Sequence, residues 1–133
     1  NGNIAAGTST GGTTAKRWGR VGDAPIIGAG TYAQNGVCGV SATGTGEFFI
    51  RVGVARAICA RMEFNAESAQ EAANHVIAEV GATTGTDGAI GDGGVIVLDG
   101  RGGAAWAMNT PGMYRASQSA DGAPVIQIFA DEE

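Results

Sequence analysis

The sequence predicts an α+β fold in which strands come first, two helices follow, and further strands end the chain. Three observations predict this fold. The chain has 133 residues, enough for one domain or one half of a larger domain. Hydrophobic residues make up 44% of it, enough for a packed core. The apolar pattern changes to a helical period and then back. Alternating strand–helix–strand units are absent, which disfavours a dinucleotide-binding fold.

Composition and charge exclude several classes of protein. A net charge of −5, with 16% charged residues, argues against a nucleic-acid-binding surface. The 24 glycines follow no three-residue period, so collagen is excluded. The longest uncharged run, residues 24–46, is too rich in glycine and polar residues to span a bilayer. The N-terminus has no signal-peptide pattern, and we expect a cytoplasmic protein.

The first third of the chain predicts strands and one long loop. Asn1-Gly2 is a turn signal, and residues 3–9 are expected to form the strand after it, so the chain would begin inside a hairpin. Residues 10–35 form a glycine-rich loop of a length that is usually functional. Residues 36–42 are expected to form a buried strand.

Two helices are expected in the middle of the chain. After Gly46, one helical face carries Phe48, Val52, Ala55, Cys59 and Met62. A second helix begins at Ser68, which forms a capping box with Glu71, and its apolar face carries Ala69, Ala72, Val76 and Val80. His75 falls beside this face, which predicts an interfacial or solvent-facing histidine.

The remaining residues predict a loop and two hairpins. Residues 83–94 are expected to form a mobile loop of Gly, Thr and Asp. The strands are expected at residues 95–98 and 104–108, joined through residues 99–102, and at residues 113–117 and 125–129.

The cysteines and the histidine limit the chemistry. Cys38 and Cys59 are expected to be reduced, buried thiols, which indicates a reducing compartment, although a disulfide stays open. A single His cannot build a metal site or a Ser-His-Asp triad by itself, and we expect no metal and no cofactor.

The first segment with chemical potential is Arg20-Val21-Gly22-Asp23. Arg binds a carboxylate through two parallel hydrogen bonds, and Asp binds an ammonium group. The pair therefore suits the zwitterionic end of an amino acid. The alternative is a local ion pair between Arg20 and Asp23 that stabilises the loop.

The second segment is Thr43-Gly44-Thr45-Gly46-Glu47, between a buried strand and a helix. Glycines there expose backbone N–H groups near the positive end of a helix dipole, which stabilises an anion or an oxyanion. The segment lacks the Lys-Ser/Thr pair of a P-loop, and the alternative is a tight turn.

Hydroxyl groups are also concentrated in residues 8–12. Thr8, Ser9 and Thr10 could orient a neighbouring nucleophile or make local turns. With no conventional nucleophile and base apparent, a threonine that uses its own N-terminal amine is worth considering.

Five segments, taken together and in order, carry a family resemblance over nearly the whole chain. They are Gly7-Thr8-Ser9-Thr10-Gly11-Gly12, Gly19-Arg20-Val21-Gly22-Asp23, Gly28-Ala29-Gly30-Thr31-Tyr32-Ala33, Thr43-Gly44-Thr45-Gly46-Glu47 and Asn109-Thr110-Pro111-Gly112-Met113-Tyr114-Arg115. They resemble the β subunit of plant-type (type III) asparaginases and isoaspartyl peptidases, which are N-terminal nucleophile hydrolases.

The resemblance implies an amidohydrolase and peptidase that cleaves its own precursor into α and β chains. Residues 1–133 would be the β-subunit portion of a single domain, the C-terminal half of an αββα sandwich. The partner would be the α subunit from the same precursor, in an (αβ)2 heterotetramer. The substrate would be L-asparagine or a β-aspartyl dipeptide.

The resemblance also implies roles for individual residues. Arg20 would bind the substrate α-carboxylate and Asp23 its ammonium group, with Val21 and Gly22 between them. Thr43 and the N–H of Gly44 would form the oxyanion hole. Gly46 would contact the amino end of the substrate, Thr45 would belong to the substrate site, and Thr10 would support the nucleophile.

The nucleophilic Thr of this family lies upstream of Asn1, so the chain alone is expected to be inactive. Two alternatives stay open. One is glycosylasparaginase, which cleaves a sugar–asparagine bond. The other is a non-catalytic, amino-acid-binding relative that has lost its nucleophile.

Overall fold

The computed structural model describes residues 2–131, and their fold is α+β, as predicted. The predicted turn at Asn1-Gly2 includes Asn1, which lies outside the described residues. The described elements are β1 (Thr31–Gln34), β2 (Cys38–Gly44), α1 (Gly46–Val52), α2 (Val54–Phe64), α3 (Ala69–Ala82), β3 (Gly93–Asp99), β4 (Ala104–Met108), β5 (Gly112–Ser117) and β6 (Val125–Phe129).

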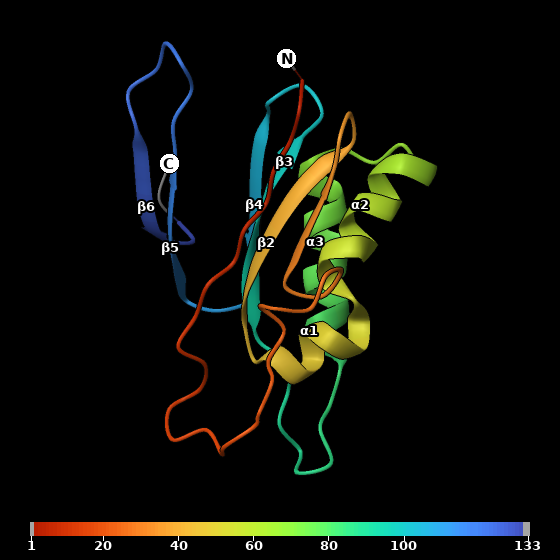
Figure 1. The fold of residues 1–133 in the computed structure, drawn as a ribbon, viewed down its shortest axis with the longest axis vertical. Helices are drawn as coiled ribbons and strands as arrows, with labels where there is room; N and C mark the ends of the chain where they lie inside the picture. Colours follow the sequence, from red (N-terminus) through yellow and green to blue (C-terminus); the bar gives the residue numbers. More distant parts are fainter. Residues whose placement is uncertain (1, 132–133) are drawn as a thin grey trace.

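The strands form two antiparallel sheets. Strands β1-β2-β3-β4 make a four-stranded sheet in that order, and β5-β6 make a separate two-stranded sheet. The helices cover one face of the larger sheet, and the β5–β6 hairpin stands on its other side (Figure 1). The β2–β3 ladder runs from Cys38 opposite Asp99 to Gly44 opposite Gly93, so the Thr43–Gly44 segment is at its last step.

The core lies between the four-stranded sheet and the helices. Its largest fully buried side chains include Val40 and Val95 from the sheet and Phe49, Ile58 and Val76 from the helices. The sequence predicts buried positions for Val40, Val76 and Val95, whereas Phe49 and Ile58 fall outside the predicted helical face. Burying one face of each element provides the main favourable free energy.

The first predicted helix is interrupted at Gly53. This residue takes a left-handed conformation (φ 67°), and its N–H donates to the carbonyls of Phe49 and Ile50. A glycine in this conformation is a frequent helix C-cap, so α1 ends there and α2 begins at the next residue. The predicted face nevertheless turns inward, since Ala55 and Cys59 are fully buried.

The predicted start of the second helix and its solvent-facing His75 are confirmed. Ser68 caps α3, and both hydrogen bonds of its capping box with Glu71 are present. His75 is solvent-facing, as predicted, with Nδ1 2.9 Å from Oε2 of Glu67. Hydrogen bonds from Arg61 and His75 lower the pKa of the Glu67 carboxyl to about 2.

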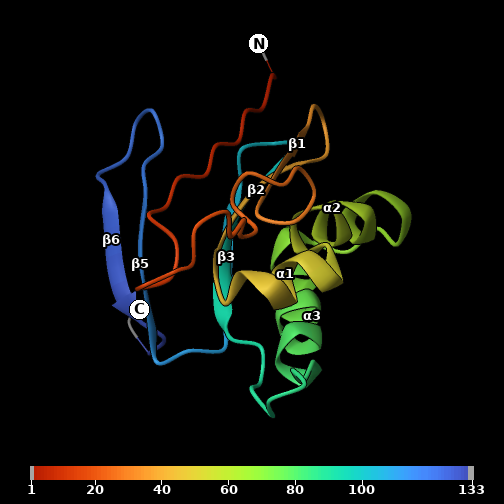
Figure 2. The same ribbon diagram turned by 60° about the horizontal axis from the view of Figure 1, so that its bottom comes forward.

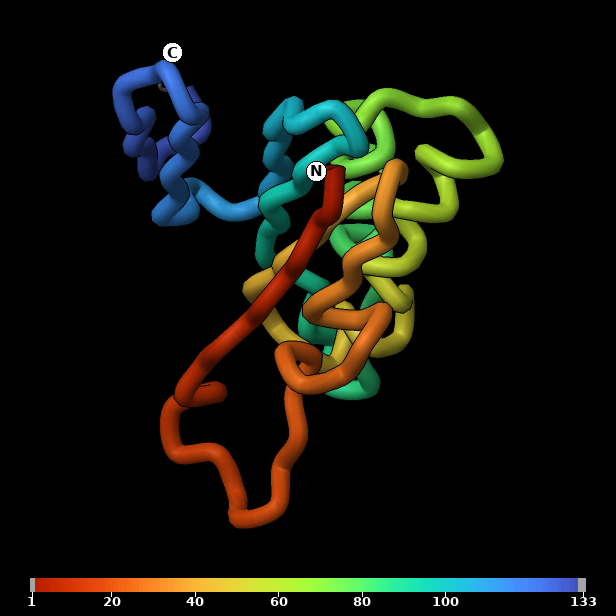
Figure 3. The backbone as a smooth tube through the Cα atoms, turned by 45° about the horizontal axis from the view of Figure 1, so that its top comes forward, coloured from red at the N-terminus to blue at the C-terminus, as the bar shows by residue number. Residues whose placement is uncertain are grey.

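The strand predicted for residues 3–9 is wrong. The segment is extended, but its contacts are isolated bonds, such as Ile4 N–H to Asn35 Oδ1 (2.8 Å) and Thr8 Oγ1 to the Gly30 carbonyl (2.9 Å). The segment lies against β2, since Ser41 Oγ donates to the Gly7 carbonyl at 3.3 Å. A strand needs backbone hydrogen bonds to its neighbour along its length, and no described strand forms such a ladder with this segment. In Figures 2 and 3 the red N-terminal segment is drawn as a plain extended trace that leads into the long loop.

The prediction of two reduced thiols is also wrong. Cys38 at the start of β2 and Cys59 in α2 form a disulfide, with Cα atoms 5.7 Å apart and both residues fully buried. Residues that the sequence places 21 positions apart meet because α2 packs directly on β2. The thiol-based argument for a reducing compartment is therefore lost. Among the described helices, none has the length and apolar character needed to cross a membrane.

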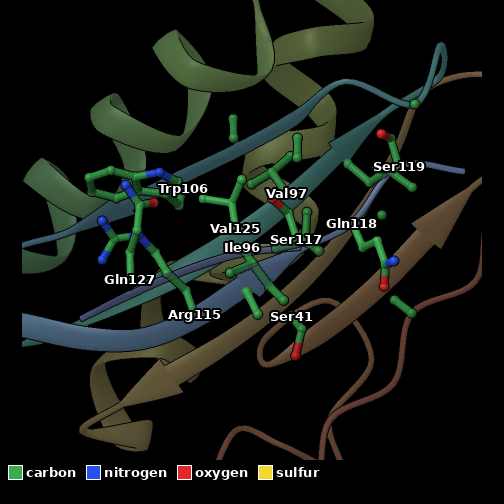
Figure 4. A pocket seen from close by; sticks show the side chains of 18 of the residues that line it. Ser41, Ile96, Val97, Trp106, Arg115, Ser117, Gln118, Ser119, Val125 and Gln127 are labelled. Carbon is green, nitrogen blue, oxygen red and sulfur yellow. The ribbon is translucent and has the colours of Figure 1, made fainter. Parts of the chain in front are cut away.

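The sheet face opposite the helices carries exposed apolar side chains. Ile96 and Leu98 of β3 are 45% and 39% exposed there. A cavity of about 670 Å³ lies between this face and the β5–β6 hairpin, and Trp106, Arg115 and Val125 are among its lining residues (Figure 4). Within residues 2–131, the helices therefore cover one face of the four-stranded sheet more completely than the β5–β6 hairpin covers the other.

Candidate active site

Four of the predicted site residues line one small cavity near the end of β2. The cavity has a volume of about 360 Å³. Its lining includes the predicted residues Thr10, Asp23, Thr43 and Gly44. The other lining residues are Gly7, Thr8, Ser9, Ala24, Ser41, Ala42, Ile96, Met113 and Tyr114. Segments from the N-terminal stretch, the long loop, β2, β3 and β5 therefore meet at this point.

Asp23 is a buried carboxylate with an unsatisfied oxygen. The residue is only 7% exposed, and Oδ2 has no hydrogen-bond partner among the described residues. Burial raises the pKa of Asp23 above its ordinary value of 3.8. Hydrogen bonds from the backbone N–H groups of Asp23 and Ala24, and the positive charge of Arg20, act in the opposite direction. A buried acceptor without a partner is costly, and a cationic ligand in the cavity would satisfy it.

The backbone around Asp23 folds into a tight turn that fixes its position. Its carbonyl accepts hydrogen bonds from Ile26 N–H (2.9 Å) and Gly30 N–H (3.1 Å). A Cβ on Gly30 would lie 2.6 Å from that same carbonyl carbon and oxygen, so only glycine allows this approach. The predicted functional loop is thus held against the start of β1 by its own glycines.

Arg20 pairs with Glu47, and the alternative of a local ion pair with Asp23 is wrong. Nε and Nη2 of Arg20 donate to Oε1 and Oε2 of Glu47 at 3.0 and 2.9 Å. A Cβ on Gly22 would lie 2.7 Å from Nη1, so this glycine leaves space beside the guanidinium. Arg20 itself does not line the cavity.

Gly46 is the point where Arg20 and Asp23 converge. A Cβ there would lie 2.7 Å from Asp23 Oδ1 and 3.3 Å from Arg20 Nη2. Both charged groups therefore lie within 3.3 Å of one position at the first residue of α1. A cationic and an anionic side chain thus lie beside the same backbone position, two residues after Gly44.

The sheet register directs the Gly44 N–H away from β3. The backbone N–H groups near the end of β2 alternate in direction. Thr45 N–H, one residue after β2, donates to the Asp92 carbonyl on the β3 side, and Ala42 N–H donates to the Gly30 carbonyl on the opposite side. In an antiparallel ladder this alternation places the Gly44 N–H on the same side as that of Ala42, opposite β3.

Three other predicted residues have less direct placements. Thr10 lines the cavity, and its Oγ1 accepts a hydrogen bond from Gly12 N–H (3.0 Å), which is the local turn considered as its alternative. Thr45 Oγ1 donates to Asp92 rather than into the cavity. Val21 is 60% exposed and lies outside the cavity lining.

The sequence did not identify several partners of the site. Thr8 Oγ1 lies 2.7 Å from Ser41 Oγ, a contact between a coil segment and β2. Glu47 and Asp92 were read only as members of a motif and a loop. Opposite charge near Arg20 could have suggested Glu47, but nothing local joins residues 27 positions apart. Within residues 2–131, no cluster of His, Cys, Asp and Glu could hold a metal ion.

Comparisons with known proteins identify the family of the chain. A family model described as asparaginase matches residues 1–128. The chain is 46% identical over 132 residues to the isoaspartyl peptidase of Escherichia coli K12, covering 99% of this chain and 40% of that protein. It is 45% identical over 130 residues to the isoaspartyl peptidase of Salmonella typhimurium, covering 98% of this chain and 40% of that protein.

An archaeal relative has a similar level of identity. The chain is 44% identical over 115 residues to the plant-type L-asparaginase of Pyrococcus abyssi, covering 85% of this chain and 35% of that protein. The chain thus spans two fifths or less of the length of these relatives. The family model, in contrast, matches nearly all of it, and the chain belongs to the asparaginase family.

Proposed function

We propose that this chain is the β-subunit portion of an amidohydrolase that releases L-aspartate from L-asparagine, from β-aspartyl dipeptides, or from both. The observation that carries the proposal is the buried Asp23 carboxylate, with Oδ2 unpartnered, on the cavity that Thr43 and Gly44 also line. A buried anion beside a cation and a backbone donor suits an α-amino acid whose side-chain carbonyl is attacked.

Each residue has a defined role in this reaction. Asp23 accepts hydrogen bonds from the substrate ammonium group, and Arg20 donates to its α-carboxylate. The Thr43 hydroxyl and the Gly44 N–H donate to the carbonyl oxygen as it becomes an oxyanion. Gly46 leaves room for the amino end of the substrate, because a side chain there would collide with Asp23. Thr10 supports the nucleophile from the turn that it makes with Gly12.

The nucleophile in this proposal is an N-terminal Thr upstream of Asn1. Its free amine takes the proton from Oγ, and Oγ attacks the amide carbon to give a tetrahedral intermediate. Ammonia or an amino acid then leaves with a proton, and a β-aspartyl ester remains on Thr. Water hydrolyses that ester and releases aspartate, so the enzyme returns to its first state.

The proposed partner is the α subunit from the same precursor, in an (αβ)2 assembly with an αββα sandwich. The exposed Ile96 and Leu98 on the sheet face opposite the helices support this proposal, as does the 670 Å³ cavity beside them. Ile126 and Tyr114 in the β5–β6 hairpin are also exposed, at 75% and 87%. Apolar surface of this kind is typical of a face that another chain covers. A cytoplasmic location is part of the same proposal.

The test uses the full-length gene product, with release of aspartate measured from L-asparagine and from a β-aspartyl dipeptide. We expect hydrolysis of at least one substrate and a mature chain that begins with Thr. Arg20→Ala should lower kcat/KM strongly, because losing one member of a buried charged contact costs about 2–5 kcal/mol. Thr43→Ala should lower kcat about 10²-fold or more, as expected for a lost oxyanion donor.

The same assay, with a glycosylated asparagine added as a third substrate, separates the two alternative functions. Release of the sugar from a glycosylated asparagine, with no hydrolysis of the other two substrates, would support glycosylasparaginase instead. Binding of aspartate without hydrolysis of any substrate, in a protein with no Thr at a processed terminus, would support a non-catalytic relative.

A further inference from the structure

The loop of residues 83–94 leads directly to the proposed oxyanion segment. The loop folds back on itself, with Gly85 N–H bonded to the Ala89 carbonyl (2.7 Å) and Gly91 N–H to the Thr83 carbonyl (3.0 Å). Its last residues enter β3, where Gly93 lies opposite Gly44. The residue just before this pair is Asp92, and the proposed reaction assigns it no role.

Asp92 makes two hydrogen bonds to Thr45. Its carbonyl accepts from Thr45 N–H at 2.9 Å, and its carboxylate Oδ1 accepts from Thr45 Oγ1 at 2.5 Å. The regular β2–β3 pairing ends at Gly44 and Gly93, so these bonds extend the contact by one residue beyond the ladder. The side-chain bond depends on the identity of residue 92, whereas the backbone bond does not.

These bonds constrain the Gly44 backbone from one side. Gly44 has φ 151°, and it lies between Thr43, which is paired with Gly94, and Thr45. Glycine is the most conformationally free residue, so the direction of its N–H depends on how firmly its neighbours are held. The Gly44 site also has little room, because a Cβ there would lie 2.3 Å from the Asp92 carbonyl oxygen.

Asn109 holds the backbone on both sides of Asp92. Its Oδ1 accepts from Gly93 N–H at 2.8 Å, and its Nδ2 donates to the Gly91 carbonyl at 3.0 Å. Asp92 is therefore the middle residue of a short segment with a fixed backbone, and its carboxylate is directed at Thr45. A fixed carboxylate of this kind can restrain its partner far better than a mobile surface side chain can.

We propose that Asp92 is a positioning residue that holds Thr45, and through it the Gly44 N–H, in the direction required to stabilise the oxyanion. The proposal rests on the proposed function of the Thr43-Gly44 segment. Asp92 does not line the 360 Å³ cavity, so it acts through Thr45 rather than on the substrate. Its removal should therefore affect the transition state and not substrate binding.

The kinetic test compares Asp92→Ala, Asp92→Asn and Thr45→Val in the full-length gene product. Asp92→Ala should lower kcat about 10-fold, less than loss of a donor itself, with KM unchanged. Asp92→Asn keeps an acceptor at Oδ1 and should restore kcat to within about 2-fold. The double variant Asp92→Ala/Thr45→Val should have a kcat no lower than that of the slower single variant, because the two substitutions remove the same hydrogen bond. An unchanged kcat in Asp92→Ala, or a raised KM with unchanged kcat, would overturn the proposal.

A second measurement does not depend on activity. Amide hydrogen exchange of peptides that cover residues 43–46 should be faster in Asp92→Ala than in the parent protein. Asp87→Ala is the matched control, since Asp87 lies in the same loop and bonds only to Ala89 N–H in the described contacts. If the parent hydrolyses no substrate, the proposed function fails, while unchanged exchange in Asp92→Ala overturns the positioning role by itself.

Discussion

The carboxylate of Glu47 accepts two parallel hydrogen bonds from Arg20, one from Nε at 3.0 Å and one from Nη2 at 2.9 Å. The contact joins the long loop to the first turn of α1. Hydrogen bonds from the Glu47 backbone N–H and from the Arg20 side chain lower the pKa of the Glu47 carboxyl below its usual value of 4.5. The pairing fixes the plane of the guanidinium through Nε and Nη2, and Nη1 takes no part in it.

Replacing Glu47 by Gln should therefore weaken substrate binding and leave the chemical step intact. Partly exposed ion pairs contribute about 0.2–1 kcal/mol, so we expect KM to rise about 2–5-fold at unchanged kcat. Steady-state kinetics with L-asparagine or a β-aspartyl dipeptide measure this. Glu63→Gln is the matched control, because it removes a comparable Glu–Arg pair, with Arg56, outside the cavity lining. A lower KM in Glu47→Gln would mean that Glu47 competes with the substrate.

Asp23→Asn should make the ligand-free protein more stable at neutral pH while abolishing substrate binding. Burial raises the pKa of Asp23 above 3.8, so the native state holds this proton more tightly than the unfolded state does. The resulting stability is complete below pH 3.8 and is lost as the pH rises through the native pKa. The amide of Asn is neutral at every pH, so Asp23→Asn should not lose stability as the pH rises. We expect its free energy of unfolding at pH 7 to exceed that of the parent by about 1 kcal/mol.

Urea unfolding between pH 4 and pH 8 measures this effect through the pH dependence of the unfolding free energy. Asp121→Asn, which changes an exposed carboxylate in the β5–β6 hairpin, should leave the pH dependence of the parent unchanged. Equal slopes for the parent and Asp23→Asn would contradict a buried, desolvated carboxylate at residue 23.

Gly44→Ala should destabilise the fold as well as the site. A Cβ at this position would lie 2.3 Å from the Asp92 carbonyl oxygen and 2.7 Å from the Gly93 Cα, and the residue has φ 151°. We expect a loss of about 2–4 kcal/mol in the free energy of unfolding, since overpacking and backbone strain add. Gly11→Ala, where a Cβ meets nothing within 4 Å, should cost little. Equal costs in the two variants would rule out a tight Gly44–Gly93 contact.

The Cys38–Cys59 disulfide should contribute measurably to stability. The bond closes a loop across a sequence separation of 21, for which restriction of the unfolded chain predicts about 3 kcal/mol. Urea unfolding with and without a reductant tests this, and the double variant Cys38→Ala/Cys59→Ala should be insensitive to the reductant. Titration of thiols in denaturant, without reductant, should find none. Two titratable thiols would instead restore the original prediction of reduced cysteines.

Local chemistry accounts for the elements that the sequence predicted correctly. The capping box at Ser68 and Glu71, the apolar face of α3, and the two C-terminal hairpins all depend on residues close in the chain. The types and spacing of Arg20, Asp23, Thr43 and Gly44 also suggest a zwitterionic substrate and an oxyanion, and their roles stay a prediction. Of these, the structure brings Asp23, Thr43 and Gly44 onto one cavity.

The features that the sequence could not predict all depend on contacts between distant residues. The pairing of Arg20 with Glu47 spans 27 positions, and that of Thr45 with Asp92 spans 47. The segment of residues 3–9 has a strand-like sequence, yet it forms no strand because pairing requires a neighbouring backbone and not a propensity. The sequence by itself determined which groups are chemically suited to the site. Only the tertiary structure decided which of them meet, because α2 packing on β2 and the crossing of loop and sheet set those distances.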